Sequence, residues 1–194
     1  NFALSLSDLD PELIKLANKE CLLSSTYEPS SKTKMKLRAA PGAGTMYLQS
    51  ECAEALAELF AGAEEAGYKL YLKSAYRAYK TQKTMYNNRL ERNNGKDDGW
   101  VSKPGASDHQ TGLGCDVVPG SWKDKSMNSN MASTPECQWM AEHCYEYGFV
   151  IRYPEDKQDI TEINYEPWHL RYVGKEVARY IWRNGLCLEE FHEQ

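Results

Sequence analysis

The sequence predicts a compact α+β domain with a small, mainly antiparallel sheet flanked by helices. Helical stretches and short apolar strands are mixed along the chain without a regular strand–helix alternation, which is typical of this class. The 194 residues suit one domain, and a hydrophobic fraction of 41% is enough for a packed core. We therefore expect a single domain over residues 1–194, with a looser wrapping segment over about 1–48.

The N-terminal quarter is expected to contain one helix followed by irregular chain. Residues 8–23 carry Asp10 as a cap, Pro11 in the first turn and an apolar stripe of leucines, a pattern typical of a helix. The stretch over 24–44 is polar and contains prolines and lysines, so we predict irregular structure there.

The second quarter has the clearest pattern. Residues 50–66 repeat apolar side chains at helical spacing, with Ser50 as the expected N-cap and Gly67 at the end. Residues 69–75 alternate like a strand, and a second helix is expected from about Tyr79.

A long stretch over 92–107 is rich in Gly, Asn and Asp. It predicts a surface loop, which we expect to form one wall of a cleft. After it, the pattern predicts strands over 112–118 and 149–152 and helices over 135–147 and 175–184, with 168–173 either a strand or the entry to the last helix.

Charge and hydropathy exclude two classes of function. Lys plus Arg number 23 and Asp plus Glu number 28, so the net charge is −5, and no basic block marks a nucleic-acid-binding surface. No apolar run approaches the roughly 20 residues that span a bilayer, so we expect no transmembrane segment. The chain starts at Asn1 rather than Met, which leaves room for a removed signal peptide or anchor upstream.

Six cysteines are many for a reducing cytosol, and none forms the CxxC pair of a zinc ribbon. Cys137 and Cys144 lie in one predicted helix, about 10 Å apart along its axis, too far to bond each other. Cys115 lies in an apolar run and is expected to be buried. The oxidation state of the cysteines stays open.

Two of the four histidines lie in unusual surroundings. His109 precedes Asp116 with glycines between them, and His169 lies in an aromatic segment. Two imidazoles and one carboxylate are a ligand set of catalytic zinc, with a fourth position left open. Because the glycines disfavour one helix face and the odd offset disfavours one strand, we expect a loop that leads into a strand. Structural histidines are the alternative, and His143 and His192 are expected at the surface.

Two further charged residues suit hydrolytic chemistry. Glu166 lies three residues before His169, where its carboxylate could take a proton from water at the same centre. Pro167 disfavours a helical conformation there. Arg77 follows a predicted strand and could offer a bidentate fork to a carboxylate or an oxyanion. A surface carboxylate and a surface ion pair are the alternatives.

Three motifs contain these residues. The first consists of Ser74, Tyr76, Arg77 and Gln82. The second consists of Ser107, His109, Gly112, Gly114 and Asp116. The third consists of Glu166, Trp168, His169, Arg171, Tyr172, Val173 and Gly174. Together they resemble the signatures SxYRxxxxQ, SxHxxGxAxD and ExWHxRYVG of the VanY-type D-alanyl-D-alanine carboxypeptidases, a zinc metallopeptidase family that includes L,D-carboxypeptidases and is related to VanX dipeptidases. The resemblance covers about 70–175 well and 8–60 more loosely.

The resemblance implies a role for each residue of the motifs. It implies that a zinc ion lies in a cleft and is held by His109, Asp116 and His169. It implies that Glu166 is the general base and that Arg77 stabilises the transition state. The residues expected to bind the substrate are Ser107, Gln82, Tyr76 and Trp168.

Two positions depart from the family's pattern. Gly114 replaces the usual alanine, a change expected only to loosen the packing. Glu162 stands where relatives often carry glycine, so the turn before Tyr165 is expected to differ.

The implied activity is hydrolysis of the terminal D-Ala-D-Ala bond of peptidoglycan stem peptides, with release of D-alanine. The alternatives are an L,D-carboxypeptidase acting on tetrapeptide stems, a D-Ala-D-Ala dipeptidase, and a zinc-containing cell-wall binding module without catalysis. We expect a monomer with zinc as cofactor, stem peptides as partners and no nucleic-acid partner. It would act outside the cell or at the outer face of the cytoplasmic membrane.

Overall fold

Four short antiparallel strands form the central sheet, in the order β3–β4–β6–β5. The computed structural model describes residues 4–194. The strands are β3 Leu70–Ser74, β4 Gly114–Pro119, β5 Phe149–Ile151 and β6 His169–Tyr172. Helices flank this sheet, so the predicted α+β class with a small antiparallel sheet is confirmed.

The register of the two inner strands brings distant residues together. Every residue of β4 and β6 is buried, so both faces of these strands are covered. Asp116 on β4 lies directly opposite His169 on β6, and Ser74 at the end of β3 is its partner on the other side. Two of the three predicted metal ligands are therefore cross-strand neighbours.

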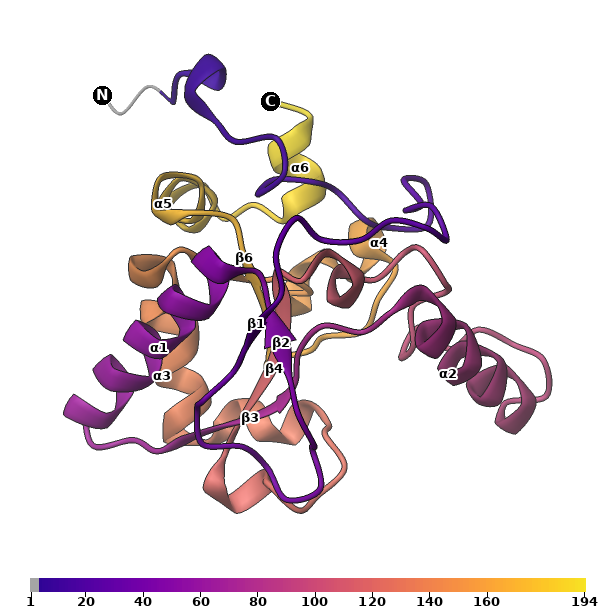
Figure 1. The fold of residues 1–194 in the computed structure, drawn as a ribbon, viewed down its shortest axis with the longest axis horizontal. Coiled ribbons are helices and arrows are strands. Elements are labelled where there is room, and N and C mark those ends of the chain that lie inside the picture. Colours follow the sequence, from indigo (N-terminus) through magenta and orange to yellow (C-terminus); the bar gives the residue numbers. More distant parts are fainter. Residues whose placement is uncertain (1–3) are drawn as a thin grey trace.

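Helices α1 (Ser50–Glu65) and α3 (Pro135–His143) contact each other and the sheet (Figure 1). The buried face of α1 contains the predicted apolar residues Leu56, Leu59, Phe60 and Ala63. The expected N-cap is wrong by one position: Gln49 is the N-cap, and the Ser50 hydroxyl hydrogen-bonds that of Thr33 at 2.8 Å. The α-helix predicted to reach residue 147 ends at His143 and continues as a 3-10 turn.

Helix α2 (Tyr79–Arg92) lies apart from the other helices at the edge of the molecule (Figure 1). Its sequence is polar, and Gln82 is its one buried residue. The chain that follows runs without helix or strand to residue 107, as the composition predicted. This helix and its loop therefore serve as a wall rather than as part of the core.

The C-terminal region packs on an apolar cluster of its own. Helices α5 (Lys175–Asn184) and α6 (Leu188–His192) enclose it together with β5. Gly185 ends α5 in a left-handed conformation, as expected for a C-terminal glycine. The sequence predicted α5 and did not predict α6 or the short α4 (Gln158–Thr161).

The helix predicted over 8–23 is wrong. The structure has a 3-10 turn at Leu6–Asp8 and then irregular chain. The carbonyl oxygens of Leu13 and Ala17, which would accept helical hydrogen bonds, instead accept from the buried guanidiniums of Arg171 and Arg152 at 2.9 and 3.3 Å. Long-range polar contacts therefore override the local helical pattern.

The segment that follows is largely irregular, as predicted, and adds a two-stranded ribbon of β1 (Thr33–Lys34) and β2 (Tyr47–Leu48). None of the described helices has the length and apolar character needed to cross a bilayer. All six cysteines are free thiols, and Cys115 is fully buried as expected.

Candidate metal centre and its cavity

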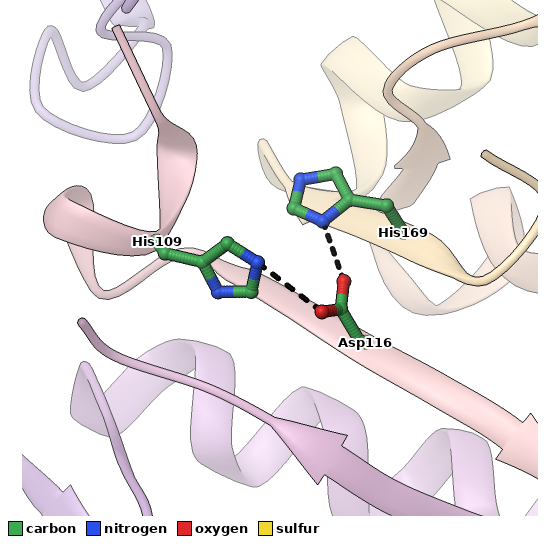
Figure 2. A group of neighbouring side chains, drawn as sticks. All are labelled: His109, Asp116 and His169. Carbon is green, nitrogen blue, oxygen red and sulfur yellow. Dashed lines mark hydrogen bonds and ion pairs between the residues drawn. The ribbon is translucent and has the colours of Figure 1, made fainter. Parts of the chain in front are cut away.

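Three buried side chains converge at the centre of the sheet (Figure 2). His109 comes from the 3-10 turn Asp108–Thr111, Asp116 from β4 and His169 from the start of β6. Each offers one ligand atom, and these atoms lie within 4.8 Å of one another. The residue set expected from the sequence is thus brought together in space.

The local sequence explains how His109 and Asp116 reach the same point. The Ser107 hydroxyl accepts a hydrogen bond from the His109 amide at 3.2 Å and so caps the 3-10 turn. Gly112 ends that turn with a φ of 70°, a conformation that favours glycine. The chain then enters β4 at Gly114. This is the turn leading into a strand that the glycine-containing spacing predicted.

One nitrogen of each imidazole has a partner outside the donor set, the Ala75 carbonyl for His109 and Asp108 for His169, and these partners orient the rings. His109 Nδ1 lies 2.7 Å from the Ala75 carbonyl oxygen, to which it donates, so Nε2 carries the lone pair. His169 Nδ1 lies 2.8 Å from Asp116 Oδ1, and Nε2 lies 3.4 Å from Asp108 Oδ2. Outer partners of this kind fix the tautomers of histidines that bind metals.

The charges around the three donors favour a cation. Burial lowers the pKa of His169, but its hydrogen bonds to Asp108 and Asp116 outweigh burial and raise that pKa to about 9. Burial and the nearby Arg77 lower the pKa of His109. A proton on His169 therefore supplies positive charge that a divalent ion would replace. Two imidazoles and one carboxylate fit zinc, because it accepts nitrogen and oxygen donors in a tetrahedral set.

Glu166 and Arg77 line the same cavity as the three donors. This cavity has a volume of about 360 Å³. Burial raises the pKa of Glu166 to about 8, and Asp116 adds to this rise, whereas His169 and Arg77 oppose it. A carboxyl group with a pKa in this range can take up and release a proton near neutral pH.

Two side chains hold the guanidinium of Arg77, and a backbone hydrogen bond fixes the residue beside His109. Its Nη1 donates to Gln82 Oε1 and its Nη2 donates to Ser74 Oγ, both at 3.0 Å. The backbone amide of Arg77 donates to the His109 carbonyl oxygen at 3.0 Å. Gln82 Nε2 donates in turn to the Ser102 carbonyl oxygen at 2.7 Å. Arg77 is therefore anchored beside the metal donors rather than at the outer surface.

The four predicted substrate-binding residues lie in different settings. Ser107 and Trp168 line the cavity. Gln82 also lines it, although both polar atoms of its amide are engaged by Arg77 and Ser102. Among the described residues, those that line the cavity do not include Tyr76, whose hydroxyl donates to Glu28 at 3.1 Å. The placement of Tyr76 gives no support to its predicted contact with the substrate.

Several wall residues were not identified from the sequence. Trp100 from the predicted wall loop stacks on Trp168, with ring centroids 6.4 Å apart. Tyr153 stacks on His169 at 5.1 Å. The other wall residues from α2 and the loops are Met85, Arg89, Val101, Ser102, Met127 and Asn128. A lone tryptophan in a polar, glycine-rich loop was the available signal for Trp100.

Asp108 was also missed, although it lies inside the second motif. It is fully buried, and Arg171 Nη1 and Arg152 Nε approach its two carboxylate oxygens at 2.7 and 2.9 Å. Burial would raise the pKa of Asp108, but the two guanidiniums outweigh burial and hold it well below its usual range. Asp108 lies in a polar run of the sequence, so the pattern around it gave no sign that it is buried.

The two departures from the family pattern have structural consequences. A Cβ atom placed on Gly114 would lie 2.7 Å from the Cβ of Asp108 and 3.1 Å from its carbonyl carbon. The expectation that glycine only loosens the packing is therefore wrong, because this position is in close contact with Asp108. Glu162 has a φ of 60°, so it adopts the left-handed conformation that glycine adopts more readily.

The sequence profile of the family described as VanY, D-alanyl-D-alanine carboxypeptidase, matches residues 45–175. The putative carboxypeptidase YodJ of Bacillus subtilis (strain 168) is 39% identical over 189 residues, covering 95% of this chain and 69% of YodJ. A D-alanyl-D-alanine carboxypeptidase of Enterococcus faecalis is 34% identical over 146 residues, covering 70% of this chain. The chain spans about half, 52%, of that enterococcal protein.

Two solved structures share the fold and more than a quarter of the sequence. The LdcB LD-carboxypeptidase superposes with a TM-score of 0.87 at 38% identity, covering 100% of this chain and 94% of that one. A variant of the vancomycin-resistance D,D-pentapeptidase VanY, in complex with Zn(II), superposes with a TM-score of 0.77 at 28% identity, covering 93% and 99%. The family profile and the YodJ match over nearly the whole sequence show that the chain belongs to the VanY-type D-alanyl-D-alanine carboxypeptidase family.

Proposed function

We propose that this protein is a zinc-dependent carboxypeptidase that removes the C-terminal D-alanine from peptidoglycan stem peptides. One observation carries the proposal: Glu166 and Arg77 line the same cavity as His109, Asp116 and His169. The Zn(II) complex of a VanY structure supports the choice of metal. When bound, zinc would polarise the scissile carbonyl and make the attacking water more acidic.

Glu166 acts as the general base. Its carboxylate takes the proton from the attacking water and later gives it to the departing amine of D-alanine. A pKa raised to about 8 by burial suits both transfers, since the group can hold the proton between the two steps. A binding module would have no use for such a base, which weighs against the non-catalytic alternative.

Arg77 stabilises the negative charge that develops on the scissile carbonyl oxygen. Gln82 and Ser74 hold the guanidinium in place before substrate arrives, so little orientational freedom remains to be lost. Gln82 therefore acts through Arg77, and the Ser107 hydroxyl remains a candidate contact at the cavity wall.

The cavity favours a peptide over a free dipeptide. Among the described residues that line it, the carboxylates are Asp116 and Glu166, and both have roles at the reacting centre. The ammonium group of D-Ala-D-Ala would therefore lack a carboxylate partner near the scissile bond. A wall formed by Trp100, Met85 and Arg89 suits the uncharged backbone of a longer stem peptide instead.

The terminal bond of a pentapeptide is the D,D bond predicted from the sequence. A tetrapeptide, whose terminal bond is an L,D bond, is the second candidate, and one observation favours it. LdcB, an LD-carboxypeptidase, superposes with a TM-score of 0.87, against 0.77 for the D,D-pentapeptidase VanY. Either substrate lies outside the cytoplasmic membrane, so we propose that the protein acts there, as a monomer.

The test compares native protein with Glu166→Gln on a pentapeptide, a tetrapeptide and D-Ala-D-Ala, with products identified by mass spectrometry. The native protein should release D-alanine from one of the two stem peptides and leave the dipeptide largely intact. Glu166→Gln should keep its zinc and lower turnover by about 10²–10⁴, the contribution of a positioned base. Glu162→Gln, an exposed neighbour in sequence, is the matched control and should retain activity. A native protein that binds stem peptides without cutting them would refute the enzymatic proposal.

A further inference from the structure

Four charged side chains form a sealed cluster outside the cavity lining, next to His169. Asp108, Arg152 and Arg171 have no solvent exposure, and Glu189 is 8% exposed. Arg152 joins the two carboxylates: its Nε lies 2.9 Å from Asp108, and its Nη1 and Nη2 donate to Glu189 at 2.7 and 2.9 Å. Arg171 donates to the other oxygen of Asp108 at 2.7 Å. We call these four residues the buried charge cluster.

The buried charge cluster is balanced, with two carboxylates and two guanidiniums. Such clusters are costly to desolvate, and well-packed apolar residues are often at least as stable in their place. Stability alone therefore explains the buried charge cluster poorly. Its side-chain contact with the candidate metal centre points to another role, because Asp108 Oδ2 lies 3.4 Å from His169 Nε2.

We propose that Asp108 is a positioning residue that accepts a hydrogen bond from His169 Nε2 and so directs the lone pair of Nδ1 toward the metal. This inference rests on the proposed zinc site. Arg171 and Arg152 hold each oxygen of the Asp108 carboxylate from the outside, which leaves the carboxylate little freedom to turn. Gly114 contributes as well, since its lack of a side chain lets Asp108 lie close to β4.

The two ends of the chain complete this arrangement. Glu189 lies on α6, and Asn18 of the N-terminal segment donates to its carboxylate at 3.1 Å. The carbonyl oxygens of Ala17 and Leu13 accept from Arg152 and Arg171. All these outer groups lie outside residues 45–175, the part matched by the family profile. We infer that α6 and the N-terminal segment hold the metal ligand His169 in place from a distance, through Glu189 and Arg152.

The test measures zinc affinity by competition with a chromophoric chelator, in the absence of substrate. Asp108→Asn keeps the shape of the side chain and removes its charge. Loss of an outer hydrogen-bond partner typically weakens metal binding by about 10–100-fold, and we expect an effect in this range. Glu189→Gln acts through Arg152 and should weaken binding less, by a few-fold. Glu193→Gln, which removes an exposed charge just beyond α6, is the matched control and should bind zinc normally.

A purely structural role is tested by a charge-balanced double variant. Asp108→Asn alone leaves an excess of positive charge in the buried charge cluster and could prevent folding. Asp108→Asn combined with Arg171→Gln restores the balance and leaves the Arg152–Glu189 pair intact. If Asp108 positions His169, the double variant should regain the thermal stability of the metal-free native protein and still bind zinc weakly. NMR of the zinc-loaded native protein should also show a strongly hydrogen-bonded Nε2 proton on His169, and in the double variant that resonance should move upfield, because the neutral amide oxygen of asparagine is a weaker acceptor.

Native zinc affinity in the folded double variant would overturn the positioning role. A loss of affinity that follows the loss of thermal stability across all variants would overturn it too, because the effect would then be structural. A native protein that binds no zinc would instead refute the proposed zinc site itself.

Discussion

His169 lies between two groups of charged and polar side chains that differ in how their charges are met. On one side, the buried charge cluster pairs each carboxylate with a guanidinium at 2.7–2.9 Å. On the other side, the carboxylates of Asp116 and Glu166 line a cavity together with the guanidinium of Arg77 and two imidazoles. The first group pairs its charges within itself, whereas the second opens onto a cavity where a cation could join its three donors.

This difference indicates that the sealed group supports the fold and that the group at the cavity supplies reactive side chains. A balanced, sealed set of charges holds elements together and has ordinary protonation states, with the pKa of each carboxyl group held low. In the set that opens onto the cavity, burial instead raises the pKa of the Glu166 carboxyl group to about 8. Substitutions in one group should therefore leave the other group largely unaffected, and variants of each group test this.

The largest effect is expected from His169→Ala, because this residue belongs to both sides. The variant should lose most of its roughly one equivalent of zinc, and with it nearly all activity. Metal analysis of protein purified without chelator provides the measurement. His143→Ala, at the surface beside Glu146, should keep its zinc. A full equivalent of zinc in His169→Ala would show that the ligand assignment is wrong.

Arg77→Lys should affect the cavity side alone. Lysine keeps the positive charge and loses the fork that Gln82 and Ser74 now hold. We expect kcat to fall by about 10²–10³, as for the loss of one oxyanion donor, with zinc content unchanged. Arg92→Lys on the exposed end of α2 is the control. If kcat stays normal and only KM rises, Arg77 contributes to ground-state binding instead.

The sealed side should respond to acid. Burial would raise the pKa of Glu189, but Arg152 outweighs burial and lowers it, and the same holds for Asp108. A carboxyl group with a lowered folded-state pKa stabilises the fold above its unfolded pKa of about 4, and this stabilisation is lost as the pH falls through the folded value. Urea unfolding of metal-free protein should therefore show stability falling below about pH 4. In Glu189→Gln the free energy of unfolding should fall less steeply below about pH 4. An unchanged pH dependence would contradict the prediction.

The smallest effect is expected at Glu162, an exposed residue that belongs to neither group. The left-handed conformation costs a residue with a Cβ atom about 1–2 kcal/mol, and glycine avoids this cost. Glycine also loses more conformational entropy on folding, which offsets part of the gain in stability. Glu162→Gly should raise the free energy of unfolding by about 0.5–1 kcal/mol without changing zinc affinity or kcat. Asn94→Gly is the comparison, since Asn94 is also left-handed and asparagine tolerates that conformation better. An equal gain at both positions would argue against this explanation.

The sequence was informative where local pattern and chemistry coincide. Apolar spacing predicted α1, alternation predicted β3, and residue type with glycine placement predicted the set of His109, Asp116 and His169. The N-terminal helix was predicted wrongly because carbonyl oxygens of Leu13 and Ala17 bond to arginines more than 130 residues away.

The buried charge cluster was missed for a related reason. Each member looks like an ordinary charged residue in its own segment. Its partners become apparent only in the folded protein, where the 3-10 turn with Asp108, the chain directly after β5 with Arg152, β6 with Arg171 and α6 with Glu189 come together. Tyr76 shows the converse case, since its place in a motif suggested a substrate contact that its position in the fold does not support.

The thiols of this protein offer a practical route to these experiments. Five of the six cysteines are buried, and Cys21 is exposed. Burial raises the pKa of the Cys137 thiol to about 11, so the thiolate that reacts with electrophiles is scarce at neutral pH, whereas Cys21 is open to solvent. A maleimide dye should therefore label the folded protein at one position, three residues from Asn18. Fluorescence from that position would report the docking of the N-terminal segment without engineered labelling sites.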